Sequence, residues 1–198
     1  VPAGKCWGLY RMVDPCVFWI KAGLLKVGSY TQEGQVDLRY LVRGASMVGE
    51  MAVLGKASQE DFAVAITECE ICEIDIFTLS NLFRKSPELQ VWMMELMRQR
   101  LGLLEKRLQS VLFKPSRERV LVFLQDFLLD FGELEGDFIK VPNYLSHTDI
   151  AQFTSTSRQT VNRVLNQLRK KEILDYNKEI IWIKESNMGL LFDQLDAD

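Results

Sequence analysis

The stretch 86–114 limits most strongly what this chain can fold into. Ser86-Pro87-Glu88 resembles a helix start, because proline is favoured in the first helical turn and a neighbouring acid complements the helix dipole. The next proline is Pro115, and a single glycine such as Gly102 is tolerated inside a helix. The sequence therefore predicts one helix of about 27 residues, or ~40 Å at 1.5 Å per residue.

This helix carries two apolar faces. One has the alternating three and four spacing of an a/d seam, with Met94, Met97, Leu101, Leu104, Leu108 and Val111. The other face can pack on the preceding domain and consists of Leu89, Trp92, Met93, Leu96 and Leu103. Because two apolar faces need two partners, we predict that the seam pairs with a second copy of the chain. A single buried helix in a monomer is the alternative.

Short apolar stretches separated by glycines fill about the first 80 residues. The predicted strands lie at 17–20, 24–27, 36–42, 62–66 and 69–76, with Val48 in a further short one. Such short strands between turn residues favour a small antiparallel roll or barrel. The 47% content of hydrophobic residues is ample for its core, and no apolar run approaches the ~20 residues that span a bilayer.

Residues 145–171 predict two helices joined by a tight turn. Ser146 can cap the first helix, and Ser157 can cap the second. The apolar positions that would face the core are Ile150, Ala151 and Phe153 in the first helix and Val161, Val164, Leu165 and Leu168 in the second. Upstream, Pro115 forms a hinge after which Ser116 can cap another helix.

The opposite face of the second helix is polar and basic. It presents Arg158, Gln159, Asn162, Arg163 and Gln167, whose donors and acceptors suit base edges in a major groove. We expect this helix to end at Leu174 and residues 176–179 to form a turn between two β-prone stretches, as in a winged helix-turn-helix. Residues 143–184 hold 7 Lys and Arg against 4 Asp and Glu, although the whole chain has a net charge of −3. A basic island in an acidic chain indicates phosphate binding.

The order of roll, long helix, hinge and winged helix resembles the Crp/Fnr family of bacterial transcription factors. The likeness covers nearly the whole chain, and its most specific segments are 156–163 (TSRQTVNR) and 47–52 (MVGEMA). It implies an α+β fold with a β-roll at 1–85, a dimerisation helix at 86–114 and a winged helix-turn-helix at 115–198. It also implies DNA contacts by Ser157, Arg158, Gln159, Thr160, Asn162 and Arg163, a phosphate contact by Ser146, and RNA polymerase as a partner.

The effector pocket implied by the resemblance departs from a nucleotide site. It would contain Gly49, Glu50, Glu60, Asp61, Leu104 and Glu105. In cyclic-nucleotide binders of the family, an Arg-Ser pair at the places of Glu60 and Asp61 holds the phosphate, and a polar pair stands at the places of Leu104 and Glu105. Two carboxylates cannot hold an anion. We therefore expect a sensor domain that does not bind cyclic AMP and an effector that is unknown.

Other functions have weaker support. Cys69 and Cys72 form a C-x-x-C, but three residues apart in a strand they should point to opposite faces, so we expect structural thiols; a thiol sensor is an alternative. His147 is the single histidine, and nothing resembles a catalytic pair, a metal cluster or a cofactor site. We expect a cytoplasmic, non-enzymatic homodimer that binds near-palindromic duplex DNA without membrane contact. A ligand-binding module whose helix-turn-helix contacts protein is the remaining alternative.

Overall fold

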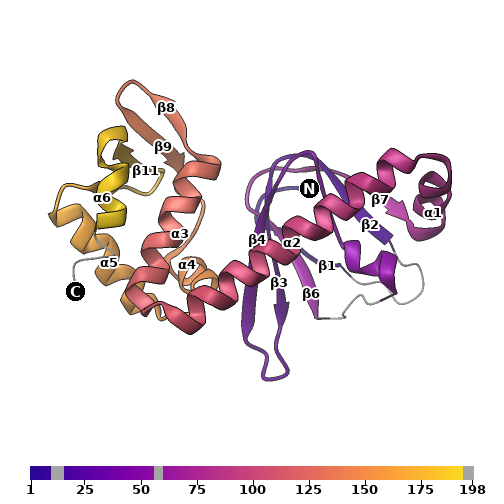
Figure 1. The fold of residues 1–198 in the computed structure, drawn as a ribbon, viewed down its shortest axis with the longest axis horizontal. Coiled ribbons are helices and arrows are strands. Elements are labelled where there is room, and N and C mark those ends of the chain that lie inside the picture. The colour runs from indigo at the N-terminus through magenta and orange to yellow at the C-terminus, as the bar shows by residue number, and fades with distance from the viewer. Residues whose placement is uncertain (10–15, 56–59, 194–198) are drawn as a thin grey trace. The chain divides into compact units, whose positions relative to one another are not determined.

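The computed structural model describes residues 1–9, 16–55 and 60–193, and the chain divides into two compact units, Val1–Glu105 and Lys106–Asp198 (Figure 1). The first unit is built on two antiparallel sheets. One has the strand order β1 (Cys6–Gly8), β6 (Asp61–Ala65), β3 (Leu24–Tyr30), β4 (Val36–Arg43). The other has the order β5 (Ser46–Val48), β2 (Cys16–Ala22), β7 (Glu70–Asp75). The predicted antiparallel roll is confirmed.

The roll core lies between these sheets because inward side chains alternate along the strands. Phe18 and Ile20 of β2 pack with Leu25 and Val27 of β3 in one buried cluster. Gly23, in the turn between these two strands, is required by close packing. Its φ is 98°, and an added Cβ would lie 2.5 Å from the Cys69 sulfur.

Helices cover the outer face of the three-stranded sheet. The 3-10 helix η1 (Glu50–Leu54) follows β5, α1 (Ile76–Lys85) follows β7, and α2 (Pro87–Phe113) runs for 27 residues, as the sequence predicted (Figure 1). Met93 and Leu96 of α2 are buried with Val17 of β2 in a second cluster. Two expectations change: α1 was not anticipated, and Leu103 is exposed instead of packing on the roll.

The second unit contains the predicted winged helix-turn-helix. Its elements are α3 (Ser116–Phe131), β8 (Glu133–Glu135), β9 (Phe138–Pro142), α4 (His147–Phe153), α5 (Arg158–Lys170), β10 (Leu174–Tyr176), β11 (Ile180–Lys184), η2 (Glu185–Asn187) and α6 (Met188–Asp193). The sheet order is β10-β11-β9-β8.

Two local predictions in this unit were wrong. Helix α5 ends at Lys170, so Leu174 does not end it but begins strand β10. Ser116 does not cap α3, because Pro115 occupies the capping position and Ser116 is already helical. Proline before a helix is compatible with its fixed φ but supplies no side-chain acceptor. Within the described ranges, no helix is long and apolar enough to cross a membrane.

Candidate nucleic-acid interface and roll pocket

Helix α4 begins with a complete capping box. The Ser146 hydroxyl accepts a hydrogen bond from the Asp149 amide at 3.1 Å and donates to Asp149 Oδ2 at 2.7 Å, and Oδ2 also accepts from the Ser146 amide at 3.0 Å. The predicted apolar residues Ile150, Ala151 and Phe153 are buried. This cap fixes where α4 starts and therefore how it presents the following turn.

Helix α5 separates an apolar face from a polar one. Its N-cap is Ser157, whose hydroxyl accepts from the Thr160 amide at 3.1 Å. The predicted core positions are all buried: Val161, Val164, Leu165 and Leu168. The predicted contact positions lie on the other face, where Arg158, Gln159, Asn162 and Arg163 are exposed and Thr160 is half-buried. The sequence therefore predicted correctly which face of α5 is buried and which is exposed.

Two arginines that the sequence did not single out hold the turn between α4 and α5. Arg119 donates to the carbonyls of Thr154 at 2.9 Å and Ser155 at 2.8 Å, and also to the carbonyl of Lys114 at 3.0 Å. Arg107 donates to the Gln152 carbonyl and the Ser155 hydroxyl. The bonds of Arg119 supply donors to the Thr154 and Ser155 carbonyls, which follow α4 and lie beyond its internal hydrogen bonds. The partners on the turn are far away in sequence from both arginines, so no local pattern could indicate these bonds.

Arg169 of α5 contacts the wing, the hairpin of β10 and β11. Its guanidinium lies 2.5 Å from Asp175 Oδ1 and 3.9 Å from the centre of the Tyr176 ring, and it donates to the Tyr176 carbonyl. The turn that follows is closed by Asn177, whose side chain accepts from the amides of Glu179 and Ile180. Arg169 therefore orients the hairpin next to α5.

His147 lies beside the polar face of α5. Burial lowers the pKa of its imidazole, a hydrogen bond with Asn162 opposes that shift, and the Arg158 charge adds to it. The ring also meets Tyr176 edge-on, with ring centres 6.0 Å apart. His147 thus joins the start of α4, the face of α5 and the wing.

In the roll, side chains of β4 and α2 contact the Glu50 carboxylate of the Gly-Glu turn. Gly49 has a φ of 81°, and Glu50 is buried, with Oε1 at 3.4 Å from Arg100 Nε of α2 and 3.2 Å from the Tyr40 hydroxyl, which donates to it. Arg100 also lies over the Tyr40 ring at 3.9 Å. Burial, with the Glu50 charge, raises the pKa of the Tyr40 phenol well above its usual range.

The other predicted pocket residues are dispersed. Asp61 pairs with Arg39 at 3.0 Å, and the Glu60 side chain is exposed on the loop before β6. Leu104 and Glu105 are exposed on α2. Sequence reasoning missed Arg39, which pairs with Asp61. It also missed Tyr40 and Arg100, which contact Glu50.

The predicted seam of α2 is largely open in the single chain. Met94, Leu101, Leu104, Leu108 and Val111 are exposed, at 71% for Met94, and Met97 is half-buried. An apolar stripe of this length on one helix is typical of a surface that a partner covers.

The cysteines occupy unlike surroundings. Cys69 is buried, with its sulfur near the Leu24 and Thr67 carbonyls, whereas Cys72 is exposed. None of the four cysteines, all of which lie in the described ranges, forms a disulfide bond. Among the described residues, no group of histidine, cysteine and carboxylate side chains is arranged to hold a metal ion.

Models of two domain families match most of the chain. A cyclic nucleotide-binding domain matches residues 9–86, and a Crp-like helix-turn-helix domain matches residues 118–187. The chain belongs to the Crp/Fnr family. It is a transcription regulator of the Crp/Fnr type with a C-terminal helix-turn-helix, so the resemblance stated from the sequence is confirmed.

Relatives of the Crp/Fnr regulator include two global regulators. The global nitrogen regulator of Nostoc sp. (strain PCC 7120) is 27% identical over 174 residues, which cover 86% of this chain and 78% of the relative. The CRP-like cAMP-activated global transcriptional regulator of Mycobacterium tuberculosis is 26% identical over 149 residues, 75% of this chain and 66% of the relative.

Solved structures show the same Crp/Fnr fold. A mutant of CooA from Carboxydothermus hydrogenoformans has a TM-score of 0.79 at 22% identity, covering 98% of this chain and 85% of CooA. FixK2 from Bradyrhizobium japonicum has a TM-score of 0.79 at 18% identity, covering 100% of this chain and 95% of FixK2. Likeness at these identities establishes the fold.

Proposed function

We propose that this Crp/Fnr regulator binds a near-palindromic DNA site as a homodimer, with one α5 helix in each half-site. The observation that carries the proposal is the division of α5. Val161 and Leu165 are buried in the unit, while Arg158 and Asn162 stand in solvent at the start and middle of the opposite face. A helix whose core face is satisfied and whose outer face carries base-reading groups fits a major groove.

The individual contacts follow from side-chain chemistry. Arg158 and Arg163 can each donate to guanine or phosphate, and the amides of Gln159 and Asn162 can both donate and accept, as adenine requires. Ser157 and Thr160 lie at the helix start, where backbone amides face a phosphate. The Ser146 hydroxyl donates to Asp149 in the free protein, so its phosphate contact requires that bond to be exchanged.

DNA selection from a random duplex pool, followed by gel shift, tests the proposal. We expect enriched sites with two-fold symmetry and binding that survives an excess of random duplex. A chain whose helix-turn-helix contacts only protein would enrich no sequence, and that result would contradict the proposal. The selection is done with the wild-type chain without added ligand. The absence of any enriched sequence would contradict the proposal, whether or not an effector raises the affinity further.

We further propose that the roll does not hold cyclic AMP. The support is that Glu60 and Asp61, the latter paired with Arg39, leave carboxylates at the two places where a phosphate would need a cation and a hydroxyl donor. The Mycobacterium relative is a cAMP-activated regulator, so the proposal is that this chain differs from that relative in its ligand. Calorimetric titration with cyclic AMP should show no binding at micromolar concentrations, and micromolar affinity would refute this part.

Family membership alone supports two further elements of the proposal, RNA polymerase as a partner on DNA and the cytoplasm as the location. Transcription in vitro from a promoter carrying a selected site tests the first. We expect the transcript level to change when the chain is added, and to stay unchanged when the site is scrambled.

A further inference from the structure

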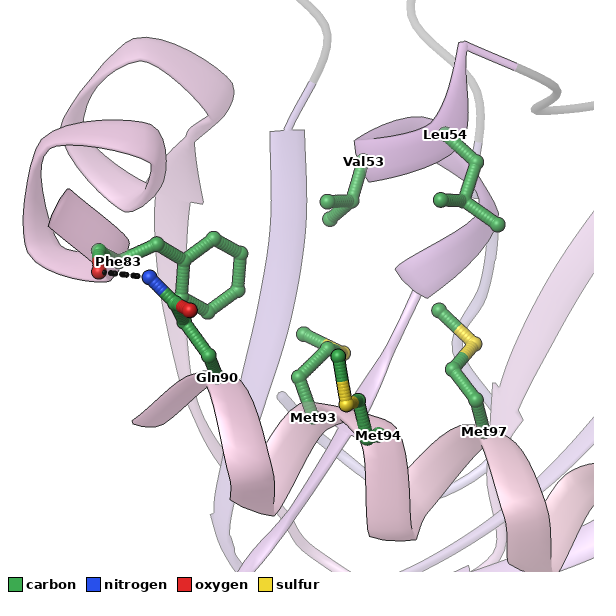
Figure 2. Close-up of a pocket in the computed structure, with 7 residues that line it drawn as sticks. All are labelled: Val53, Leu54, Phe83, Gln90, Met93, Met94 and Met97. Carbon is green, nitrogen blue, oxygen red and sulfur yellow. Dashed lines mark hydrogen bonds between the residues drawn. The ribbon is translucent and has the colours of Figure 1, made fainter. Parts of the chain in front are cut away.

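An apolar hollow lies between η1, α1 and α2 of the N-terminal unit (Figure 2). Its volume is about 490 Å³, and its lining consists of Val53, Leu54, Phe83, Gln90, Met93, Met94 and Met97. None of these seven side chains is charged. We call this hollow the methionine groove, and it is separate from the cluster of Tyr40, Glu50 and Arg100.

The walls of the methionine groove come from different elements. In Figure 2 the two side chains of η1 face the three methionines of α2 across the hollow, and Phe83 of α1 lies at one end. Gln90 closes that end, because its Nε2 donates to the Phe83 carbonyl at 2.6 Å. Met93 is buried in the packing of α2 on the roll, whereas Met94 is exposed. The groove is therefore anchored on the buried Met93 and has an open side at Met94.

The chemistry of the lining selects the ligand. Pockets that bind small molecules measure roughly 300–1,000 Å³ and are lined mainly by apolar side chains with a few polar groups. Methionine side chains are flexible and polarisable, so they adapt to ligands of different outline and pack well on aromatic rings. A charged ligand would lose its water here without gaining a counter-charge.

Helix η1 connects this groove to the turn described above. Its first residue, Glu50, pairs with Arg100 of α2, and its last residues, Val53 and Leu54, form one wall of the groove. A ligand between that wall and the methionines would add contacts between η1 and α2. Since α2 also carries the proposed dimer seam, these contacts would bias the position of that helix.

We propose that the methionine groove binds a small uncharged apolar molecule, and that its occupation changes the affinity of the regulator for DNA. The first part of this proposal, ligand binding (the binding half), depends only on the groove. The second part, the change in DNA affinity (the regulatory half), rests on the proposed function. Met94 and Met97 also belong to the seam, so a second copy of the chain is the competing occupant.

Fluorescence titration of the full chain with the uncharged probe N-phenyl-1-naphthylamine tests the binding half. Leu54 is 60% exposed, so Leu54→Glu should fold and place a carboxylate in the groove. We expect it to weaken probe binding at least about tenfold, because the charge would be desolvated by the ligand. Leu54→Trp should weaken binding as well by filling the hollow. Met51→Glu is the matched control, since Met51 is 38% exposed on η1 but does not line the groove.

Equal probe affinity in the wild type, both Leu54 variants and the control would overturn the binding half. The monomerising change Leu108→Glu separates the two occupants, because Leu108 lies on the seam away from the groove. Probe binding that appears only in the Leu108→Glu variant would mean that a second copy covers the groove, and would also overturn the proposal. We expect wild type and Leu108→Glu to bind the probe alike.

Anisotropy titration of a selected DNA site, with and without saturating probe, tests the regulatory half. We expect DNA affinity to change at least about threefold in the wild type and in Met51→Glu, and to stay constant in Leu54→Glu. An unchanged wild-type affinity would overturn this half. Failure of the chain to bind any selected DNA would instead contradict the proposed function and would leave the probe titration intact as a separate result.

Discussion

The arginines of this protein differ in what surrounds them. Arg100 lies against a buried carboxylate and an aromatic ring, and Arg119 donates hydrogen bonds to three backbone carbonyls. Arg158 and Arg163, by contrast, stand exposed on α5. Replacement of the first kind should therefore change stability, whereas replacement of the second kind should change binding to DNA.

We expect Arg158→Ala to weaken specific DNA binding by about 1–3 kcal/mol and to relax the preference at one guanine, because a bidentate contact to the base is lost. Lys170→Ala is the matched comparison, since Lys170 is exposed near the end of the same helix. It should weaken all sequences alike and reduce the salt dependence. Anisotropy titrations with specific and random duplexes measure both. An equal loss on both duplexes for Arg158→Ala would mean that α5 does not read bases.

Arg100→Met should destabilise the N-terminal unit by about 3–5 kcal/mol, because the buried Glu50 carboxylate loses its counter-charge. Among the described residues no group donates a hydrogen bond to its second oxygen, Oε2, so the hydrogen bond from the neutral Tyr40 hydroxyl to Oε1 would remain without any counter-charge. The double change with Glu50→Leu should recover most of that free energy, since no buried charge remains. Urea unfolding followed by tryptophan fluorescence, to which Trp7, Trp19 and Trp92 of this unit contribute, measures both. A single variant as stable as the double one would contradict a buried ion pair.

His147 predicts a pH dependence of stability. Burial holds its pKa below the usual value in the folded protein. Well above the unfolded pKa of about 6.5 the ring is neutral in both states, and as pH falls the unfolded chain binds the proton more tightly, so stability is lost. We therefore expect the unfolding free energy of the wild type, measured relative to His147→Gln, to decrease from pH 7 to pH 5. Urea unfolding at both pH values checks this, and a constant difference would be the contrary result.

At the scale of elements, the seam of α2 makes the most direct prediction. Leu101→Glu with Leu104→Glu should give a monomer, because like charges would meet across the paired helices. Gln99→Glu with Gln109→Glu adds the same charge at exposed positions of α2 outside the seam, and should remain dimeric. Light scattering gives the mass of each variant. A dimer in the first variant would show that the interface lies elsewhere.

The elements that the sequence predicted well are those whose residues repeat locally. The length of α2 followed from its proline-bounded periodicity, and the faces of α5 followed from apolar residues three and four apart. The hairpin of β8 and β9 was missed although Gly136, with a φ of 61°, marks its turn, because the strands are short and Leu134 is exposed. Helix α1 was missed because the apolar residues of β7 run directly into it, and only the Asp75 cap on the Thr78 amide separates them.

The contacts that could not be predicted join residues far apart in the sequence. Arg100 and Glu50 are separated by two strands and helix α1, and Arg119 reaches the turn at Ser155 from another helix. A pattern of residue types gives no information on such pairs, because their geometry exists only after the sheets and helices have packed. The candidate effector site was therefore read from the sequence as a set of carboxylates, without the arginines that compensate them.

At the scale of the whole molecule, the charge of the chain opposes DNA while the helix-turn-helix attracts it. The net charge is −3, yet the segment around α5 is basic. Phosphate binding therefore depends on presenting that segment toward the duplex and keeping acidic surfaces away from it. A dimer with two such segments can do this on one face of the DNA.

That arrangement predicts a strict spacing between half-sites. Two recognition helices related by a two-fold axis meet successive major grooves about one turn, or ~34 Å, apart. We expect an insertion of about five base pairs between the half-sites, half a helical turn, to lower the affinity to that of an isolated half-site, because the second α5 would face the opposite side of the duplex. Changing the spacer sequence at constant length is the control and should have a much smaller effect. Anisotropy titration measures both, and the monomeric Leu101→Glu, Leu104→Glu variant should be insensitive to the insertion. A dimer whose affinity tolerated the insertion would bind with only one helix, and the two-fold mode of recognition would be wrong.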